Sequence, residues 1–92
     1  MSSVGAELKI EGFVQGVGYR YFCLNRARNL GLKGWVKNNP DSSVSVLAEG
    51  DRGAIESLIA ELKAGPSSAV INNVTIKWLK ISGQFSDFKV TF

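Results

Sequence analysis

The sequence predicts a small α+β domain in which two helices cover one face of an antiparallel or mixed sheet. Three observations lead to this fold class. The 92 residues are enough for one domain, residues 1–92. Segments with two-residue alternation of apolar and polar side chains surround two segments with helical spacing. Clusters of glycine, proline and asparagine separate these segments.

The first expected strand covers residues 7–14. Its apolar positions share one face and its mostly charged positions share the other: Leu8, Ile10, Gly12 and Val14 against Glu7, Lys9, Glu11 and Phe13. A glycine-rich turn leads into an expected helix from Tyr19 to Leu30, with Gly31 as its left-handed cap. The apolar stripe of this helix consists of Phe22, Cys23, Ala27 and Leu30.

The middle of the chain predicts a β-hairpin. A short strand over 33–38 runs into a turn-rich cluster over 38–42, and a second strand over 43–49 places Val44, Val46 and Ala48 on one face.

The second expected helix begins after Asp51, a suitable N-cap, and ends at Gly65-Pro66. Its apolar residues recur with helical spacing: Ile55, Leu58, Ile59 and Leu62. Two further strands are expected around 73–81 and over 88–92. The order β-α-β-β-α-β is the ferredoxin-like sandwich, with both helices on one face. The other face, carrying Glu7, Lys9, Glu11 and Ser45, is expected to be open to solvent.

Composition narrows the functional classes. The net charge of +3 and a pI of about 9.2 suit anionic ligands only weakly, because no basic block appears. Histidine is absent, which removes the commonest general base and the commonest transition-metal ligand. A single cysteine allows no internal disulfide, and neither a signal peptide nor an apolar stretch of about 20 residues is visible. We therefore expect a cytoplasmic monomer with no membrane partner.

The turn after the first strand has the features of an anion-binding loop. Gly16 and Gly18 permit φ > 0 and a close approach of the backbone to a ligand. The first N–H groups of the following helix lack partners within the helix, and its dipole favours an anion. The guanidinium of Arg20 can donate hydrogen bonds to two phosphate oxygens at once. This loop lacks the ending of a Walker motif and the parallel βαβ pair of a dinucleotide site.

Two blocks of sequence carry a resemblance to a known family. The run Gly12-Phe13-Val14-Gln15-Gly16-Val17-Gly18-Tyr19-Arg20 resembles the acylphosphatase signature G-x-V-Q-G-V-x-[FY]-R at every specified position. Gly34-Trp35-Val36-Lys37-Asn38, followed by Val44 and Gly50, resembles the second block of that family, and Gly65-Pro66-Ser67-Ser68-Ala69 resembles the loop after its second helix. The resemblance covers essentially the whole chain.

The resemblance implies a ferredoxin-like fold and hydrolysis of acyl phosphates to a carboxylate and inorganic phosphate, without metal, cofactor or covalent intermediate. Inorganic phosphate is then a product and an inhibitor. The catalytic residues of the family fall on Arg20 and Asn38. Its phosphate-binding residues fall on Gln15, Gly16, Val17, Gly18, Tyr19 and Arg20.

One position departs from the family pattern. Ser42 stands in the hairpin turn where the family usually has glycine. Serine with φ > 0 costs roughly 1 kcal/mol, unless the turn has a different shape. Asn38 lies near this turn, so the shape of the turn bears on its placement.

Other functions are less consistent with the sequence. RNA-recognition modules share the element order, but they stack bases on aromatic residues of the central strands, and the strand over 43–49 has none. Cys23 falls on the core stripe, Trp35 and Trp78 are expected to pack, and Asp87 and Glu49 have no paired acid. A catalytically silent domain of the same family, as found within larger enzymes, is the remaining alternative. The presence of both Arg20 and Asn38 favours activity.

Overall fold

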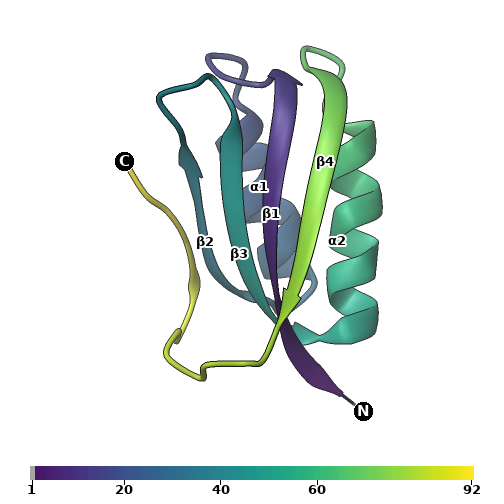
Figure 1. The fold of residues 1–92 in the computed structure, drawn as a ribbon, viewed down its shortest axis with the longest axis vertical. Coiled ribbons are helices and arrows are strands. Elements are labelled where there is room, and N and C mark those ends of the chain that lie inside the picture. Colours follow the sequence, from purple (N-terminus) through teal and green to yellow (C-terminus); the bar gives the residue numbers. More distant parts are fainter. Residues whose placement is uncertain (1) are drawn as a thin grey trace.

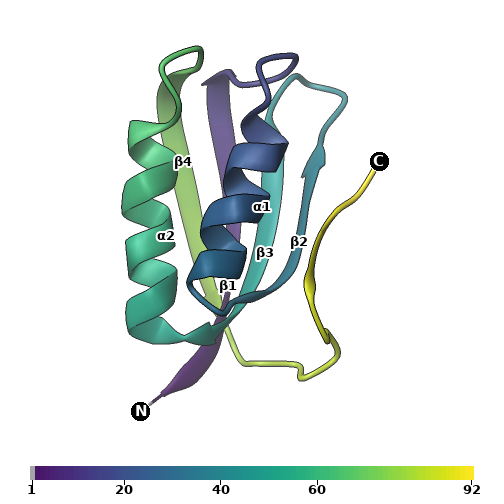
Figure 2. The same cartoon turned by 180° about the vertical axis from the view of Figure 1, so that it is seen from behind.

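The computed structural model describes residues 2–92, which form a five-stranded sheet with two helices packed on one face (Figures 1 and 2). The elements are β1 (Ser3–Phe13), α1 (Tyr19–Asn29), β2 (Lys33–Asn38), β3 (Val44–Asp51), α2 (Arg52–Ala64), β4 (Val70–Leu79) and β5 (Phe88–Val90). The strand order is β4-β1-β3-β2-β5. All neighbouring strands are antiparallel except β2 and β5, so the sheet is mixed.

The core lies between the sheet and the helices. Strand residues directly opposite one another, such as Leu8 and Val46, or Ile10 and Val44, are fully buried beneath the helices. On α2 the four predicted apolar positions, Ile55, Leu58, Ile59 and Leu62, are all buried, as their helical spacing requires. The predicted caps also form: the carboxylate of Asp51 accepts a hydrogen bond from the Ala54 amide at 3.2 Å, and Gly65 ends the helix with φ of 65°.

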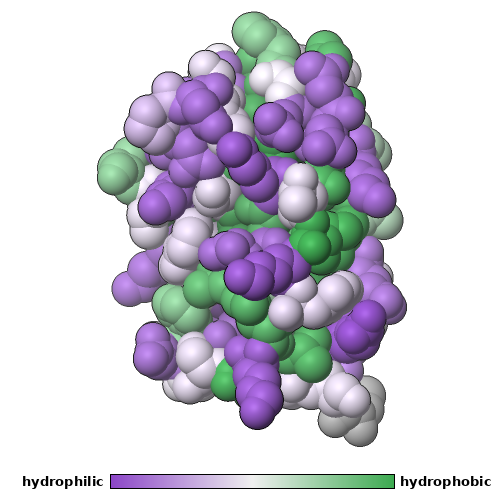
Figure 3. All heavy atoms as spheres, in the orientation of Figure 1, coloured by the Kyte–Doolittle hydropathy of each residue, from purple (hydrophilic) through white to green (hydrophobic). Residues whose placement is uncertain are grey.

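The other face of the sheet is open, as its charged positions predicted. Glu7, Lys9 and Glu11 are exposed there, and Ser45 is half-buried. Figure 3 shows that hydrophilic residues cover much of this face, with a band of hydrophobic residues between them. No helix among residues 2–92 has the length and hydrophobicity to cross a membrane.

Several element boundaries differ from the predicted ones. β1 begins at Ser3 rather than residue 7, because pairing with β3 extends to Ser3 opposite Asp51. β4 covers Val70–Leu79 rather than 73–81, because a register shift beside Gly12 lets its first residues, Val70 and Ile71, pair with the end of β1. β5 is shorter than predicted and ends at Val90.

The predicted core stripe of α1 is partly wrong. The helix ends at Asn29, and its buried residues are Tyr19, Cys23 and Ala27. Phe22 and Leu30, which were expected in the core, are half-buried and pack against its edge. Tyr19 takes the buried place because its hydroxyl donates a 2.8 Å hydrogen bond to the Leu62 carbonyl at the end of α2.

Candidate active site

The loop between β1 and α1 has the backbone conformation that its glycines predicted. Gly16 and Gly18 have φ of 75° and 76°, and nothing would obstruct a Cβ at either position, so backbone conformation alone accounts for the glycines. Gly18 is the N-cap of α1. No side chain caps this helix, and its first turn holds no acidic residue. The first amides of α1 therefore keep their capacity to donate to a ligand.

The guanidinium of Arg20 lies in the first turn of α1 and is held by residues from the other end of the chain. Its Nη1 donates to the Thr91 carbonyl at 3.4 Å, and its Cζ lies 4.8 Å from the centre of the Phe92 ring. No carboxylate among residues 2–92 forms an ion pair with Arg20. Its positive charge is therefore available to an anion beside the loop.

Asn38 is the last residue of β2 and pairs with Val44. Its Oδ1 is buried and has no hydrogen-bond partner among the described residues. A buried polar atom without a partner costs about 1–3 kcal/mol unless a ligand or a water supplies the missing bond. The position of this oxygen is therefore one where a bound molecule would be stabilised.

A cavity of about 130 Å³ joins these groups. Its lining consists of Val14, Gly16, Gly18, Tyr19, Arg20, Tyr21 and Asn38. A water molecule takes up about 30 Å³ in the liquid, so the cavity has room for a small anion and a water. The structure thus brings together the loop, Arg20 and Asn38, as the sequence predicted.

Two of the predicted phosphate-binding residues do not line this cavity. The side chain of Gln15 points to the β2–β3 turn, where its Nε2 donates to the carbonyls of Asn39 and Ser43. Val17 packs against the core, and its carbonyl accepts a 3.2 Å hydrogen bond from the Ser68 hydroxyl. Any contact of these two residues with an anion would be made by their backbone.

The turn after Asn38 is strained at the predicted position and tied together by side chains. Ser42 has φ of 76°, the only positive value at a non-glycine residue in the described chain. The Asp41 carboxylate accepts hydrogen bonds from the amide and the hydroxyl of Ser43 and forms a 3.0 Å ion pair with Lys9. The bonds from Ser43, with Lys9 beside them, hold the pKa of Asp41 well below its usual range.

Groups that suggested other chemistry have structural roles. Cys23 is fully buried, and burial raises the pKa of its thiol to about 12, so it is not a reactive nucleophile at neutral pH. Glu49 is buried, and its carboxylate accepts three hydrogen bonds from Ser82 and Gly83. Among residues 2–92, no three His, Cys, Asp or Glu side chains form a group that could hold a metal ion.

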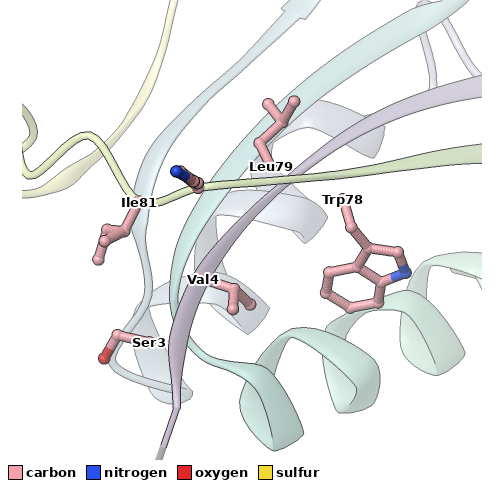
Figure 4. A pocket seen from close by; sticks show the side chains of 6 residues that line it. Ser3, Val4, Trp78, Leu79 and Ile81 are labelled. Atoms are coloured by element: carbon pink, nitrogen blue, oxygen red, sulfur yellow. The ribbon is translucent and has the colours of Figure 1, made fainter.

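A larger hollow of about 510 Å³ lies at the other end of β1, away from the loop. Its lining is mainly apolar and includes Val4, Trp78 and Ile81. In Figure 4, Val4 and the Trp78 ring lie on the same side of the sheet, above the start of α2. The Arg52 guanidinium lies 4.1 Å from the centre of the Trp78 ring, which is 36% exposed although it was expected to pack.

The residues that surround Arg20 have no signal in the sequence. Thr91 and Phe92 were expected only as the end of a strand, and their contact with Arg20 depends on the parallel pairing of β5 with β2. Tyr21, which is 53% exposed, lines the cavity because it follows Arg20 on the first turn of α1. No local pattern in the sequence indicates either contact.

The element order and the sheet topology define a ferredoxin-like βαββαβ domain with a fifth strand at its edge. The acylphosphatase family model matches residues 6–90. The chain is 45% identical to the acylphosphatase of Caldanaerobacter subterraneus subsp. tengcongensis over 83 residues, 90% of this chain and 92% of that protein. The chain belongs to the acylphosphatase family.

Solved structures agree with this assignment. The crystal structure of acylphosphatase from Bacillus subtilis superposes with a TM-score of 0.93 at 30% identity and covers 97% of this chain and 99% of that one. The full-length HypF crystal structure, in its phosphate- and nucleotide-bound form, matches with a TM-score of 0.91 at 35% identity. That match covers 99% of this chain but 12% of HypF.

Proposed function

We propose that this enzyme hydrolyses acyl phosphates to a carboxylate and inorganic phosphate, with the loop amides, Arg20 and Asn38 as its catalytic groups and no metal ion. The observation that carries the proposal is the single cavity that Arg20, the loop glycines and Asn38 share, together with the Oδ1 of Asn38, which has no hydrogen-bond partner among the described residues. Membership of the acylphosphatase family supports the substrate class.

The phosphate group binds in the loop. Its equatorial oxygens accept hydrogen bonds from the amides at the start of α1 and from the Arg20 guanidinium. These donors stabilise the charge that those oxygens carry in a loose transition state. The Arg20 guanidinium is available for this task, because its protein partners are a carbonyl and an aromatic ring rather than an acid.

The attacking water binds to Asn38. It donates one hydrogen to the Oδ1, which the protein leaves without a partner, and it turns its lone pair toward phosphorus. The water oxygen forms the new P–O bond while the bond from phosphorus to the acyl oxygen breaks, and the carboxylate leaves with that electron pair. Because an amide is a poor base, the second proton of the water passes to a phosphate oxygen.

Turnover of benzoyl phosphate in the presence of a chelator tests this proposal. Arg20→Ala should lower kcat by about 10²–10³-fold, as loss of a preorganised donor does elsewhere, and should also weaken inhibition by inorganic phosphate. Asn38→Ala should lose turnover but keep phosphate inhibition. Arg52→Ala and Asn29→Ala, which remove the same side-chain types far from the cavity, serve as matched controls.

Two results would contradict the proposal. Near-normal turnover by Asn38→Ala would exclude water positioning by this residue. Folded wild-type protein without hydrolysis above background would instead identify a catalytically silent domain. We expect the enzyme to act as a monomer. RNA binding is not expected, since the solvent-exposed face of the central strands β1 and β3 has Phe13, near the end of β1, as its aromatic residue.

A further inference from the structure

The side chain of Gln15 connects the two halves of the candidate active site. Its Nε2 donates a 2.9 Å hydrogen bond to the Asn39 carbonyl and a 2.8 Å hydrogen bond to the Ser43 carbonyl. Both amide hydrogens are therefore used, and both acceptors lie in the turn between β2 and β3. We propose that Gln15 is a positioning residue that acts on turnover through Asn38; this inference rests on the proposed function of Asn38.

The two acceptors flank the part of the turn that sets the position of Asn38. Asn39 follows Asn38 directly in the chain, and its amide donates a 2.8 Å hydrogen bond to the same Ser43 carbonyl. One side-chain amide therefore joins the two strands of the hairpin beyond the last ladder pair, Asn38 with Val44. The bonds of Gln15 therefore hold the turn that directly follows Asn38 at the end of β2.

No other hydrogen bond among the described residues joins the loop over 14–18 to the turn over 39–43. The β1–β3 ladder ends at Ile10 opposite Val44, so the sheet does not pair the two segments. The carbonyl of Val17, in the same loop, instead accepts a hydrogen bond from the Ser68 hydroxyl, in the connection between α2 and β4. Gln15 therefore supplies the direct hydrogen bonds between the phosphate loop and the turn after Asn38, while the Lys9–Asp41 ion pair ties the same turn to β1.

Loss of these bonds should act on the chemical step rather than on phosphate binding. Gln15→Met keeps the length of the side chain and the backbone N–H groups of the loop but removes both donors. A misplacement of about 1 Å can cost 10²-fold in rate, so we expect kcat for benzoyl phosphate to fall by roughly 10–100-fold. The inhibition constant of inorganic phosphate should change by less than about threefold, because the loop amides and Arg20 remain in place.

A double-mutant cycle identifies the route of the effect. If Gln15 acts through Asn38, adding Gln15→Met to Asn38→Ala should change kcat by less than about twofold, since the residue being positioned is already gone. If the two residues act independently, the two losses should multiply. The first result supports the inference, and the second overturns it.

A variant in β3, next to the same turn, separates positioning from general stability. Ser45→Ala removes the 2.7 Å hydrogen bond from the Asn39 side chain to the Ser45 hydroxyl and leaves Gln15 untouched. Its melting temperature should fall by an amount comparable to that of Gln15→Met, with kcat unchanged within twofold. If Gln15→Met does not fold, Gln15→Asn carries the same expectations, because its amide is too short to reach both carbonyls.

The failures of the two hypotheses are distinguishable. Near-normal turnover by Asn38→Ala refutes the proposed function of Asn38. Loss of turnover by Asn38→Ala together with wild-type kcat in Gln15→Met refutes only the positioning role. A rise in the phosphate inhibition constant of Gln15→Met that matches its loss of kcat would also overturn the inference, because Gln15 would then hold the phosphate loop itself.

Discussion

Replacement of Ser42 by glycine should stabilise the protein. Ser42 has φ of 76°, a conformation that costs a residue with a Cβ about 1–2 kcal/mol and costs glycine almost nothing. Its side chain is exposed and makes no hydrogen bond in the described structure, so the substitution removes no contact. Its amide, which donates a 3.2 Å bond to the Asn39 carbonyl, is retained.

The expected gain is smaller than the strain itself. Glycine increases the conformational freedom of the unfolded chain and thereby gives back about 0.4–1 kcal/mol. A net gain of about 0.5–1 kcal/mol remains, which for a domain of this size raises the melting temperature by about 2–8 °C. Thermal unfolding of Ser42→Gly, followed by circular dichroism at several scan rates, measures this shift.

Ser67 provides a matched control. It is also an exposed turn serine, but its φ is negative, so Ser67→Gly relieves no strain and should lower the melting temperature slightly. Equal shifts in the two glycine variants, or a lower melting temperature for Ser42→Gly, would refute the view that the turn stores strain at Ser42.

Three further predictions concern buried groups. Tyr19→Phe should lower stability by about 0.5–1.5 kcal/mol in urea unfolding, because it removes the 2.8 Å bond to the Leu62 carbonyl. Cys23 should resist alkylation in the folded protein and react on unfolding, since burial raises the pKa of its thiol to about 12, and mass spectrometry checks this. Burial raises the pKa of Glu49, but hydrogen bonds from Ser82 and Gly83 outweigh this effect and hold the pKa below its usual value. Glu49→Gln should therefore be less stable than wild type above about pH 5, and the gap should narrow as acid protonates the carboxylate.

Much of the fold was predictable because its signals are local. The four apolar residues of α2 and its two caps define that helix in the sequence, and the alternation in β1 identifies the buried face correctly. The start of β4 was missed because its first residues, Val70-Ile71-Asn72-Asn73, do not alternate apolar and polar side chains and pair with the end of β1 across a register shift. Tyr19 is buried on α1 where Phe22 was expected, because the Tyr19 hydroxyl bonds to α2. The spacing of residues along one helix does not indicate such a bond.

The sequence predicted the residues of the candidate active site but not the hydrogen bonds and contacts that hold them in place. The glycines, Arg20 and Asn38 carry recognisable chemistry and meet at one cavity. The side-chain bonds of Gln15 and the contact of Arg20 with Thr91 join segments that are distant in the sequence. Such bonds depend on the complete tertiary fold, so single-sequence patterns do not reveal them.

The contact between Arg20 and the C-terminal segment has a consequence for refolding. Thr91 reaches Arg20 because its own amide bonds to the Val36 carbonyl at 2.8 Å, next to the parallel pairing of β5 with β2. Contacts between such distant segments require the closure of long loops and form slowly. A refolding molecule can therefore hold both helices and the hairpin while Arg20 still lacks its acceptor. Recovery of turnover should then lag behind recovery of the helical circular dichroism signal. Enzyme activity therefore indicates that β5 has paired with β2.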